Sequence, residues 1–251
     1  MKLLHWDLET SPIIATAWKL YDTNINTDDI WEDFKIICAA WSWEGDDNIK
    51  TQTWKATTDR KISPVYGFDD RRVVEALHRD LCKADAICAQ NGDSFDLKKF
   101  NARCIKLGLP PIPPIQTIDT LKTARKHFKF TSNKLDFIGQ FLEVGSKQET
   151  SKGLWNKVIK GDKKALAEMV EYNKQDIILL KAVYHKLLPY MQNHPNHNMY
   201  TDHECCPNCG SKELRSNGYR VNRTIRYKRM FCDACGAWCK GASVKHKVKV
   251  K

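Results

Sequence analysis

Two acidic side chains, Asp7 and Glu9, stand in the first apolar stretch of the chain, LLHWDLETSP. Because successive side chains of a strand point to opposite faces, a strand here places both acids on one face with Leu3 and His5. Two carboxylates on one patch repel each other and raise each other's pKa unless a cation lies between them. The pair therefore predicts a cation site or, if the strand lies at a solvated edge, an exposed acidic patch.

A third acid lies in the longest helical pattern of the sequence, which runs from Lys163 to Leu188 and is ended by Pro189. Tyr172 and Asp176 fall inside the apolar stripe of this helix rather than opposite it. An uncompensated charge is costly to bury. The sequence therefore predicts that Asp176 meets a metal ion, a helix terminus or a basic side chain.

A fourth acid, Asp96, follows the strand-like AICAQ in the stretch NGDSFD, at the start of a helical pattern that ends at Gly108. Acids are favourable in the first turn of a helix, and Asp93 followed by Asp96 resembles a capping box. Asp96 alone therefore has a structural explanation. The four acids taken together favour a metal site.

Two C-x2-C pairs, Cys206 with Cys209 and Cys232 with Cys235, lie near the C-terminus. This spacing predicts one structural Zn²⁺ ion, because four thiolates close a tetrahedral site. Three neighbouring side chains are alternative ligands: His203, Cys205 and Cys239.

The same region is strongly basic. From Met191 onward there are 12 Lys and Arg against 4 Asp and Glu, whereas the first 190 residues carry 29 against 26. Cations that alternate with aromatic residues between the cysteine pairs suit phosphate contacts and base stacking, and the candidate contacts are Arg220, Arg223, Arg226, Lys228 and Arg229. Nucleic acid is thus the predicted partner, and a zinc-stapled cap with a solvated basic face is the alternative.

Composition limits the class of protein. A chain of 251 residues with 42% hydrophobic residues is not disordered, and no apolar run reaches the ~20 residues that cross a bilayer. The N-terminus MKLLHWDLET has no signal-peptide pattern. We expect a monomer that does not bind membranes and works in the cytoplasm, or in the host cytoplasm if a phage encodes it.

The order of elements predicts an α/β domain over residues 1–190, a linker over 191–203 and a basic zinc ribbon over 204–251. Four strand-like segments form an opening antiparallel set: 2–9, 13–20, 35–44 and 49–54. A helix over 69–83 and strands over 86–90 and 115–121 follow, and the rest of the domain is mostly helical. The terminal VKHKVKVK is typical of an edge strand or a frayed basic tail.

Three motifs match a known family. D-x-E (Asp7, Glu9), N-G-x-x-F-D (Asn91 to Asp96) and Y-x3-D (Tyr172, Asp176) resemble, in this order, the motifs of the DEDDy-type 3′-to-5′ exonucleases of the ribonuclease H-like superfamily. The resemblance covers about residues 1–190. The sister subclass has His five residues before the last acid, where this chain has Glu171, so the Tyr identifies the y type.

The resemblance implies a ribonuclease H-like fold, in which a mixed central sheet of three antiparallel strands followed by parallel strands is flanked by helices. It also implies two Mg²⁺ or Mn²⁺ ions that stabilise the attacking and leaving oxygens of a phosphodiester. By similarity, Asp7 bridges both ions, Glu9 and Asp176 complete the first ion's shell, and Asp96 holds the second. Tyr172 orients the attacking water, and the product is a nucleoside 5′-monophosphate.

The substrate implied is single-stranded nucleic acid with a free 3′ end, with DNA favoured over RNA, and Thr10 and Asn91 are the candidate contacts near the acids. The C-terminal cysteine region resembles the zinc ribbons of bacterial insertion-sequence transposases. Two alternatives stay open: a structure-selective endonuclease of the same fold, and a non-catalytic nucleic-acid-binding adaptor.

Overall fold

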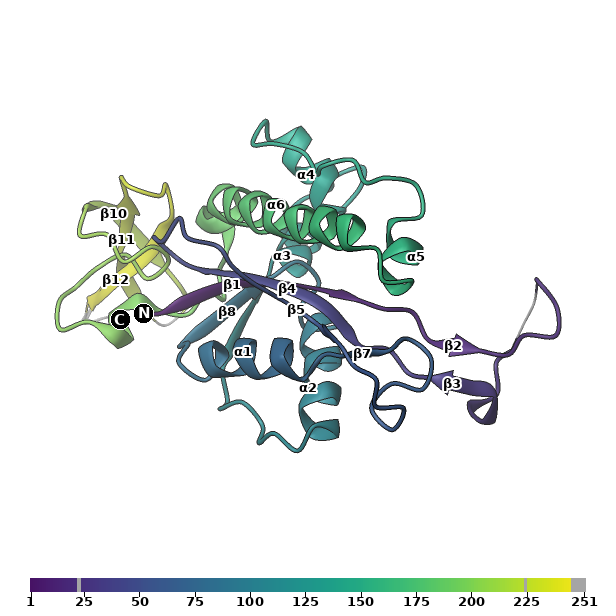
Figure 1. The fold of residues 1–251 in the computed structure, drawn as a ribbon. Helices are drawn as coiled ribbons and strands as arrows, with labels where there is room; N and C mark the ends of the chain where they lie inside the picture. Colours follow the sequence, from purple (N-terminus) through teal and green to yellow (C-terminus); the bar gives the residue numbers. More distant parts are fainter. Residues whose placement is uncertain (22–23, 224, 245–251) are drawn as a thin grey trace.

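The computed structural model describes residues 1–21, 24–223 and 225–244 (Figure 1). The strands are β1 (Leu3–Thr10), β2 (Ile14–Ala15), β3 (Ile30–Glu32), β4 (Ile36–Trp43), β5 (Lys50–Thr53), β6 (Lys55–Ala56), β7 (Phe68–Asp69), β8 (Ala86–Ala89), β9 (Gln116–Asp119), β10 (Leu214–Val221), β11 (Arg226–Cys232) and β12 (Trp238–Val244). The α-helices are α1 (Arg71–Leu81), α2 (Asp96–Lys106), α3 (Thr120–His127), α4 (Leu135–Phe141), α5 (Leu154–Ile159) and α6 (Lys163–Leu187). Short 3-10 helices are η1 (Thr27–Asp29), η2 (Leu188–Tyr190) and η3 (His197–Tyr200).

A five-stranded sheet in the order β5-β4-β1-β8-β9 forms the centre of the molecule. β1 pairs antiparallel with β4, and β4 with β5, whereas β8 and β9 continue the sheet in parallel. Helices cover both faces, with α1 and α2 on one side and α4, α5 and α6 on the other (Figure 1). The predicted fold class, a mixed central sheet flanked by helices, is confirmed.

β1 separates two hydrophobic clusters, as its alternating pattern requires. Leu4, Trp6 and Leu8 belong to the cluster that includes residues of α1 and α2, and Leu3 belongs to the cluster that includes residues of α6. The acids share the face of Leu3, so they point toward α6. Within the described residues, no helix is both long and apolar enough to cross a membrane.

The predicted strand over residues 13–20 is wrong. Only β2 forms there, and it pairs with β3 outside the central sheet. The physical reason is that β1 already pairs with β4 on one side and with β8 on the other, so no sheet position is open next to it. We call the described residues 13–21 and 24–32 the arm; it extends from the domain (Figure 1), and Trp18 and Leu20 in it are 88% and 91% exposed.

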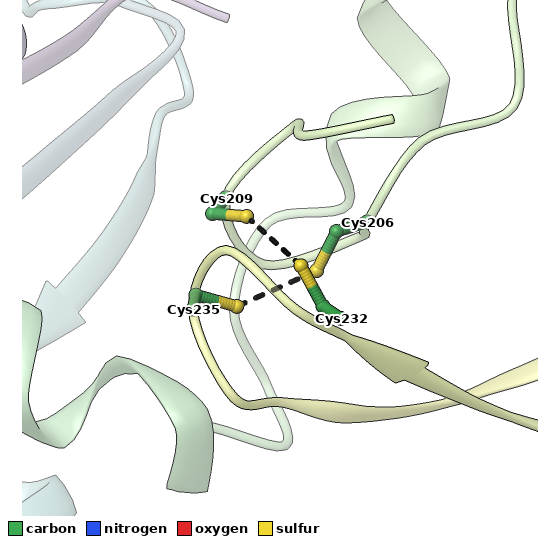
Figure 2. A group of neighbouring side chains, drawn as sticks. All are labelled: Cys206, Cys209, Cys232 and Cys235. Atoms are coloured by element: carbon green, nitrogen blue, oxygen red, sulfur yellow. Dashed lines mark hydrogen bonds between the residues drawn. The ribbon is translucent and has the colours of Figure 1, made fainter. Parts of the chain in front are cut away.

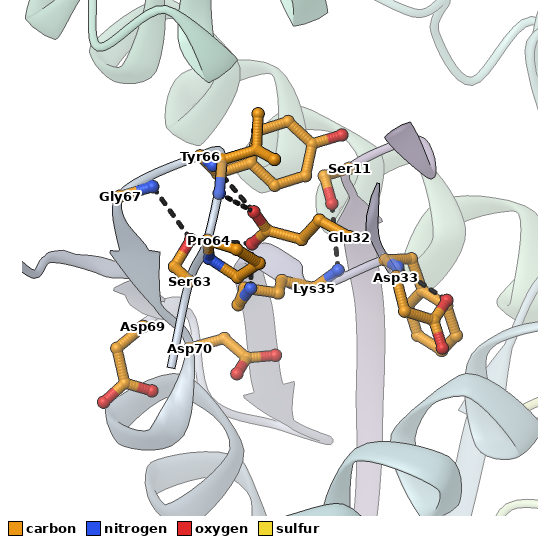
Figure 3. A network of polar contacts seen from close by, with 12 residues as sticks. Ser11, Glu32, Asp33, Lys35, Ser63, Pro64, Tyr66, Gly67, Asp69 and Asp70 are labelled. Atoms are coloured by element: carbon orange, nitrogen blue, oxygen red, sulfur yellow. Dashed lines mark hydrogen bonds and ion pairs between the residues drawn. The ribbon is translucent and has the colours of Figure 1, made fainter. Parts of the chain in front are cut away.

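A buried carboxylate anchors the arm at its base (Figure 3). Glu32 is 4% exposed and forms an ion pair with the buried Lys35. Its remaining acceptor positions are filled by the Ser63 hydroxyl at 2.6 Å and by the backbone N–H groups of Val65 and Tyr66 at 2.7 Å each. A fully hydrogen-bonded buried charge fixes the direction in which the arm leaves the domain.

The three strands β10, β11 and β12 form a separate antiparallel sheet, and the cysteine-bearing turns next to it contact the cluster that includes the end of α6. The Asn208 amide donates to the carbonyls of Leu188 at 2.9 Å and Met191 at 3.1 Å. The predicted linker contains η3, and Met191 and His194 in it are buried. This segment therefore packs against the domain. Residues 245–251, on which most of the VKHKVKVK prediction falls, lie outside the described residues.

Candidate functional site

The three acids of the first and last motifs come together on the α6 face of the sheet. Asp7 and Glu9 project from β1, and Asp176 projects from α6, where it is 2% exposed. One carboxylate oxygen from each lies within 4.8 Å of the others. The alternation of side chains along β1 and the inward face of α6 therefore bring the three acids to one point.

The loop that follows β8 brings the fourth acid, Asp96, near Asp7, although it is not one of the three acids whose oxygens lie within 4.8 Å of one another. Asn91 has a φ of 63°, a left-handed conformation that asparagine tolerates better than most residues. A Cβ on Gly92 would lie 2.5 Å from the Ala89 Cβ, so the close turn requires glycine. Asp96 then begins α2, and its Oδ1 accepts from the Leu8 backbone N–H at 3.2 Å. This bond holds Asp96 beside β1 at Leu8, the residue between Asp7 and Glu9.

The acids are strongly perturbed by being together. Burial raises the pKa of Asp7 well above its usual value, and the charges of Asp96, Glu9 and Asp176 raise it further. Burial and the charge of Asp176 raise the pKa of Glu9 to about 8, and burial raises the pKa of Asp96 to about 7. Protons or cations must therefore accompany these carboxylates at neutral pH.

A lysine that the sequence analysis missed lies in this site. Lys147 Nζ donates to Asp176 Oδ2 at 2.5 Å and to the Tyr172 hydroxyl oxygen at 2.9 Å. Although burial alone lowers the pKa of Lys147, the charge of Asp176 and these hydrogen bonds raise it overall. The lysine lies in the irregular segment between α4 and α5, where its backbone N–H donates to Asp136 Oδ1 at 2.7 Å. Of the partners predicted for Asp176, a basic side chain is present.

Asn173 is a second residue that the sequence analysis missed. It is fully buried, and its Nδ2 donates to Asp7 Oδ2 at 2.6 Å. It lies one turn before Ile177 on the inward face of α6. A polar residue inside an apolar stripe is the signal that identified Asp176, and the same signal identifies Asn173.

The donor set fits Mg²⁺ or Mn²⁺. All four acids offer the carboxylate oxygens that these hard cations prefer. Asp176 Oδ1 is a buried oxygen that no group among the described residues contacts with a hydrogen bond. A cation at this point satisfies that oxygen and relieves the repulsion that raises the pKa of Asp7.

A hollow of about 550 Å³ opens beside Asp7. Asn91, one of the two predicted nucleic-acid contacts near the acids, lines this hollow together with Lys147. Thr10, the other predicted contact, ends β1 just after a register shift relative to β4. A hollow of this size matches the volume of ordinary ligand pockets.

The second candidate metal site lies in the C-terminal sheet domain (Figure 2). The sulfurs of Cys206, Cys209, Cys232 and Cys235 lie within 4.8 Å of one another. The Cys206 to Cys235 sulfur distance is 3.7 Å and the Cys209 to Cys232 distance is 3.6 Å. A tetrahedral site with Zn–S bonds of about 2.3 Å requires sulfur separations of about 3.8 Å.

The alternative ligands lie outside this group of four sulfurs. Cys205 is buried next to the Thr201 hydroxyl, which lies 3.6 Å from its sulfur, and Cys239 lies on β12 opposite Met230. His203 precedes the first pair and is not among the grouped side chains of the described residues. The four cysteines of the two pairs therefore form the zinc-ribbon cluster that the spacing predicted.

The five predicted basic contacts divide between the two faces of the β10-β11-β12 sheet and its turn. Arg226 stacks on Tyr219, with 4.0 Å from its guanidinium carbon to the ring centroid, and Lys228 lies opposite Tyr219. Arg229 lies on the other face, 4.9 Å from the Trp238 ring centroid. Arg220 lies opposite Tyr227 on that second face, and Arg223 is exposed in the turn.

Comparison with known proteins is consistent with this architecture. The family model described as the RNase_H superfamily matches residues 32–188, a range that contains Asp96, Tyr172 and Asp176 but begins after β1. None of the curated proteins compared with this chain matches it.

Among solved structures, the family B DNA polymerase from the hyperthermophilic archaeon Pyrobaculum calidifontis is similar in fold, with a TM-score of 0.55 and 16% identity. The match covers 75% of this chain and 24% of the polymerase chain. The chain thus spans about a quarter of that protein, and the likeness concerns the fold alone.

Proposed function

This chain belongs to the ribonuclease H superfamily, and from that membership and its acidic site we propose that it is a metal-dependent 3′-to-5′ exonuclease. It removes nucleoside 5′-monophosphates from the 3′ end of single-stranded nucleic acid, preferably DNA. The observation that carries the proposal is the convergence of Asp7, Glu9 and Asp176 within 4.8 Å, with Tyr172 one turn from Asp176. A structural ion-pair network alone needs neither the raised carboxylate pKa values nor a fourth acid beside them.

Asp7, Glu9, Asp96 and Asp176 would hold the metal ions. When bound, two Mg²⁺ or Mn²⁺ ions supply the positive charge that stabilises the attacking and leaving oxygens of the phosphodiester. The buried Asn173 amide fixes the orientation of the Asp7 carboxylate through its 2.6 Å hydrogen bond. Fixed ligands lower the reorganisation needed during the reaction.

Tyr172 positions the attacking water in this proposal. Lys147 Nζ donates to the Tyr172 oxygen at 2.9 Å, so the hydroxyl hydrogen of Tyr172 is left to be donated to another oxygen. The ammonium group of Lys147 also places a positive charge beside the site, where negative charge develops on the phosphate oxygens. Lys147 and Tyr172 therefore act as a pair that orients the nucleophile.

The zinc ribbon is proposed to bind the same nucleic acid away from the acids. Its cations stack on aromatic rings on both sheet faces, as Arg226 does on Tyr219 and Arg229 on Trp238. Stacked guanidinium groups are held in place for phosphate contacts, and exposed rings such as Trp238, 52% exposed, can stack on bases.

The direction of cleavage is tested with single-stranded oligonucleotides labelled at the 5′ end, in Mg²⁺ and in Mn²⁺, on DNA and RNA in parallel. The proposal expects a ladder of labelled products that shortens one nucleotide at a time and a circular single strand that stays intact. Cleavage of the circle would show instead that the chain is an endonuclease of the same fold. If no substrate is cleaved in the presence of either metal ion, the adaptor hypothesis would take the place of the nuclease.

A further inference from the structure

The segment TLKTARKHFKFTSNK, residues 120–134, has an unusual charge pattern. It contains five Lys and Arg and no Asp or Glu, in a chain that carries 30 acids elsewhere. It forms α3 and the connection to α4. Its two phenylalanines, Phe128 and Phe130, stack with ring centroids 5.1 Å apart and pack against the hydrophobic cluster that includes residues of α6. The cations of the segment, rather than its rings, are therefore the candidate contacts for a nucleic-acid backbone.

One side of this segment forms a wall of the hollow that opens at Asp7. Arg125 and Lys134 line the hollow of about 550 Å³ together with Asp7 and Asn91. Within the described residues, neither of these two basic side chains forms an ion pair. Asn133 also lines the hollow, and its Oδ1 is a buried oxygen with no hydrogen-bond partner in the described part of the chain. This side of the segment therefore presents two cations and an amide to the hollow, beside the apolar Leu121.

The other side of α3 faces a second hollow, of about 160 Å³. Lys122, Lys126 and His127 line it from α3, and Asn193 and His194 line it from the segment that leads to the zinc ribbon. Lys122 pairs with Asp93 at 2.6 Å. Lys126 has no such partner among the described ion pairs, so its charge is free to meet a phosphate.

The arm lacks such an excess of cations. Its described residues carry the exposed Asp28 and the half-buried Asp29 against the single exposed cation Lys19. Phosphates are therefore attracted more strongly along α3 than along the arm. A strand whose 3′ end lies at Asp7 therefore leaves the site most favourably over α3.

We propose that residues 120–134 are a binding track for the phosphodiester backbone of a single strand, running from the acidic site across α3 to the segment that carries the ribbon. This proposal rests on the proposed function for the position of the 3′ end. Arg125 and Lys134 contact the phosphates next to the terminal nucleotide, and Lys126 contacts phosphates farther toward the 5′ end. The track joins the acidic site and the ribbon into one continuous surface.

The test exploits strand length. Because Lys126 lies across α3 from the hollow at Asp7, the variant Lys126→Gln should weaken binding of a 20-nucleotide strand several-fold and leave a 3-nucleotide strand unaffected. Arg125→Gln should weaken binding of both. Removing one cation that binds a phosphate of the single strand should reduce the slope of log affinity against log salt by about 0.7. Lys106→Gln is the matched control, because Lys106 is an exposed cation in the last turn of α2 without an ion pair in the described structure.

Binding is measured by fluorescence anisotropy without added Mg²⁺, with fluorescent DNA and RNA strands whose 3′-terminal linkages are phosphorothioates to resist cleavage. An unchanged 20-nucleotide affinity and salt slope in Lys126→Gln would overturn the track, and so would an equal reduction in affinity for both lengths. A length-dependent reduction together with no cleavage by the intact protein would instead overturn the exonuclease and keep the track. Cleavage that is insensitive to Lys126 at every length would keep the exonuclease and reject the track.

Discussion

The acidic site and the four-cysteine site both suit metal ions, but the chain builds them in opposite ways. The acids come from β1, α2 and α6, and large hydrophobic clusters on both faces of the central sheet hold these elements. The cysteines come from two turns next to a small sheet whose buried cluster is Cys206, Cys232 and Ala237. In the first site the fold brings together charges that repel, and in the second a bound zinc ion would hold together a domain with almost no core.

Because of this difference, we expect removal of the metal ion to have opposite effects on activity and folding at the two sites. Loss of Mg²⁺ should abolish chemistry and leave the fold, because the packing of α6 on the sheet does not depend on the ion. Loss of Zn²⁺ should unfold the ribbon and leave the chemistry, because domains of this size derive their folding free energy from the metal. Four measurements test this contrast.

The largest effect is expected for Asp7→Asn. Removing the central carboxylate should reduce cleavage by at least about 10³-fold, more than the loss of one stabilising hydrogen-bond donor usually costs. The thermal midpoint should not fall, because a repelling charge is removed. Cleavage rates and thermal unfolding of Asp7→Asn are compared with those of Asp47→Asn, an exposed aspartate on the β4–β5 turn. A variant that loses its fold together with its activity would contradict the separation of site and fold.

The double substitution of Cys232 and Cys235 by Ser should remove the zinc and unfold the ribbon. Cleavage of short strands should persist within about twofold, because the acids lie on other elements, while affinity for long strands falls. Zinc content, long-strand affinity and short-strand cleavage are measured together. Cys205→Ser is the control and should keep its zinc, because Cys205 lies outside the group of four sulfurs. Loss of short-strand cleavage in the double variant would show that the two sites are not independent.

A smaller effect is expected for Tyr172→Phe, which removes one hydroxyl and keeps the ring. Turnover should fall by about 10²-fold, with Mg²⁺ affinity and KM nearly unchanged, because the hydrogen bond is needed to orient the nucleophile. Single-turnover rates are compared with those of Tyr190→Phe, whose tyrosine is 54% exposed. A defect confined to Mg²⁺ affinity would place Tyr172 among the groups that only support the ligands.

The smallest effect concerns stability against pH in buffer without Mg²⁺. Glu9 has a pKa of about 8 in the folded chain against a usual value of 4.5, so between these values the folded state holds a proton that the unfolded state has lost. The free energy of unfolding should therefore fall as pH rises from about 4.5 to about 8. Thermal midpoints measured across this range should fall less steeply in Glu9→Gln, and added Mg²⁺ should raise the midpoint more at pH 8 than at pH 5. An identical slope in both proteins would mean that Glu9 is not the titrating group.

Residues in regular patterns were predictable from the sequence. Asp7 and Glu9 follow the period of a strand, and Asp176 follows the period of a helix, so their directions could be derived before any tertiary contact was known. The cysteine spacing was equally informative because each pair forms a local turn. The parallel strands and the confirmed fold class were implied by the resemblance of the three motifs to a known family, and the order of elements agreed with them.

The missed features depend on tertiary placement. Lys147 lies in a segment without periodicity, and only the packing of α4 and α5 against α6 brings its ammonium group to Asp176. Residues 13–20 of the arm were predicted as a strand of the opening antiparallel set because their local residues favour strand, whereas the pairing of β1 on both sides leaves no place beside it. The basic side chains on the two sides of α3 could not be assigned to a surface from the sequence, because the hollows that they line are completed by neighbouring segments.

The division of the acidic site between β1 and α6 has a consequence for how the protein is made. Asn173 and its partner Asp7 are separated by 166 positions in the chain, and Asp176 follows Asn173. Synthesis proceeds from the N-terminus, so a nascent chain carries Asp7 and Glu9 for most of its elongation without the helix that completes the site. Beside the ribosome, where nucleic acid is abundant, the unfinished chain holds only part of the proposed catalytic set. Under the proposed function, the late synthesis of α6 would delay the chemistry until the central sheet and its covering helices have been synthesised.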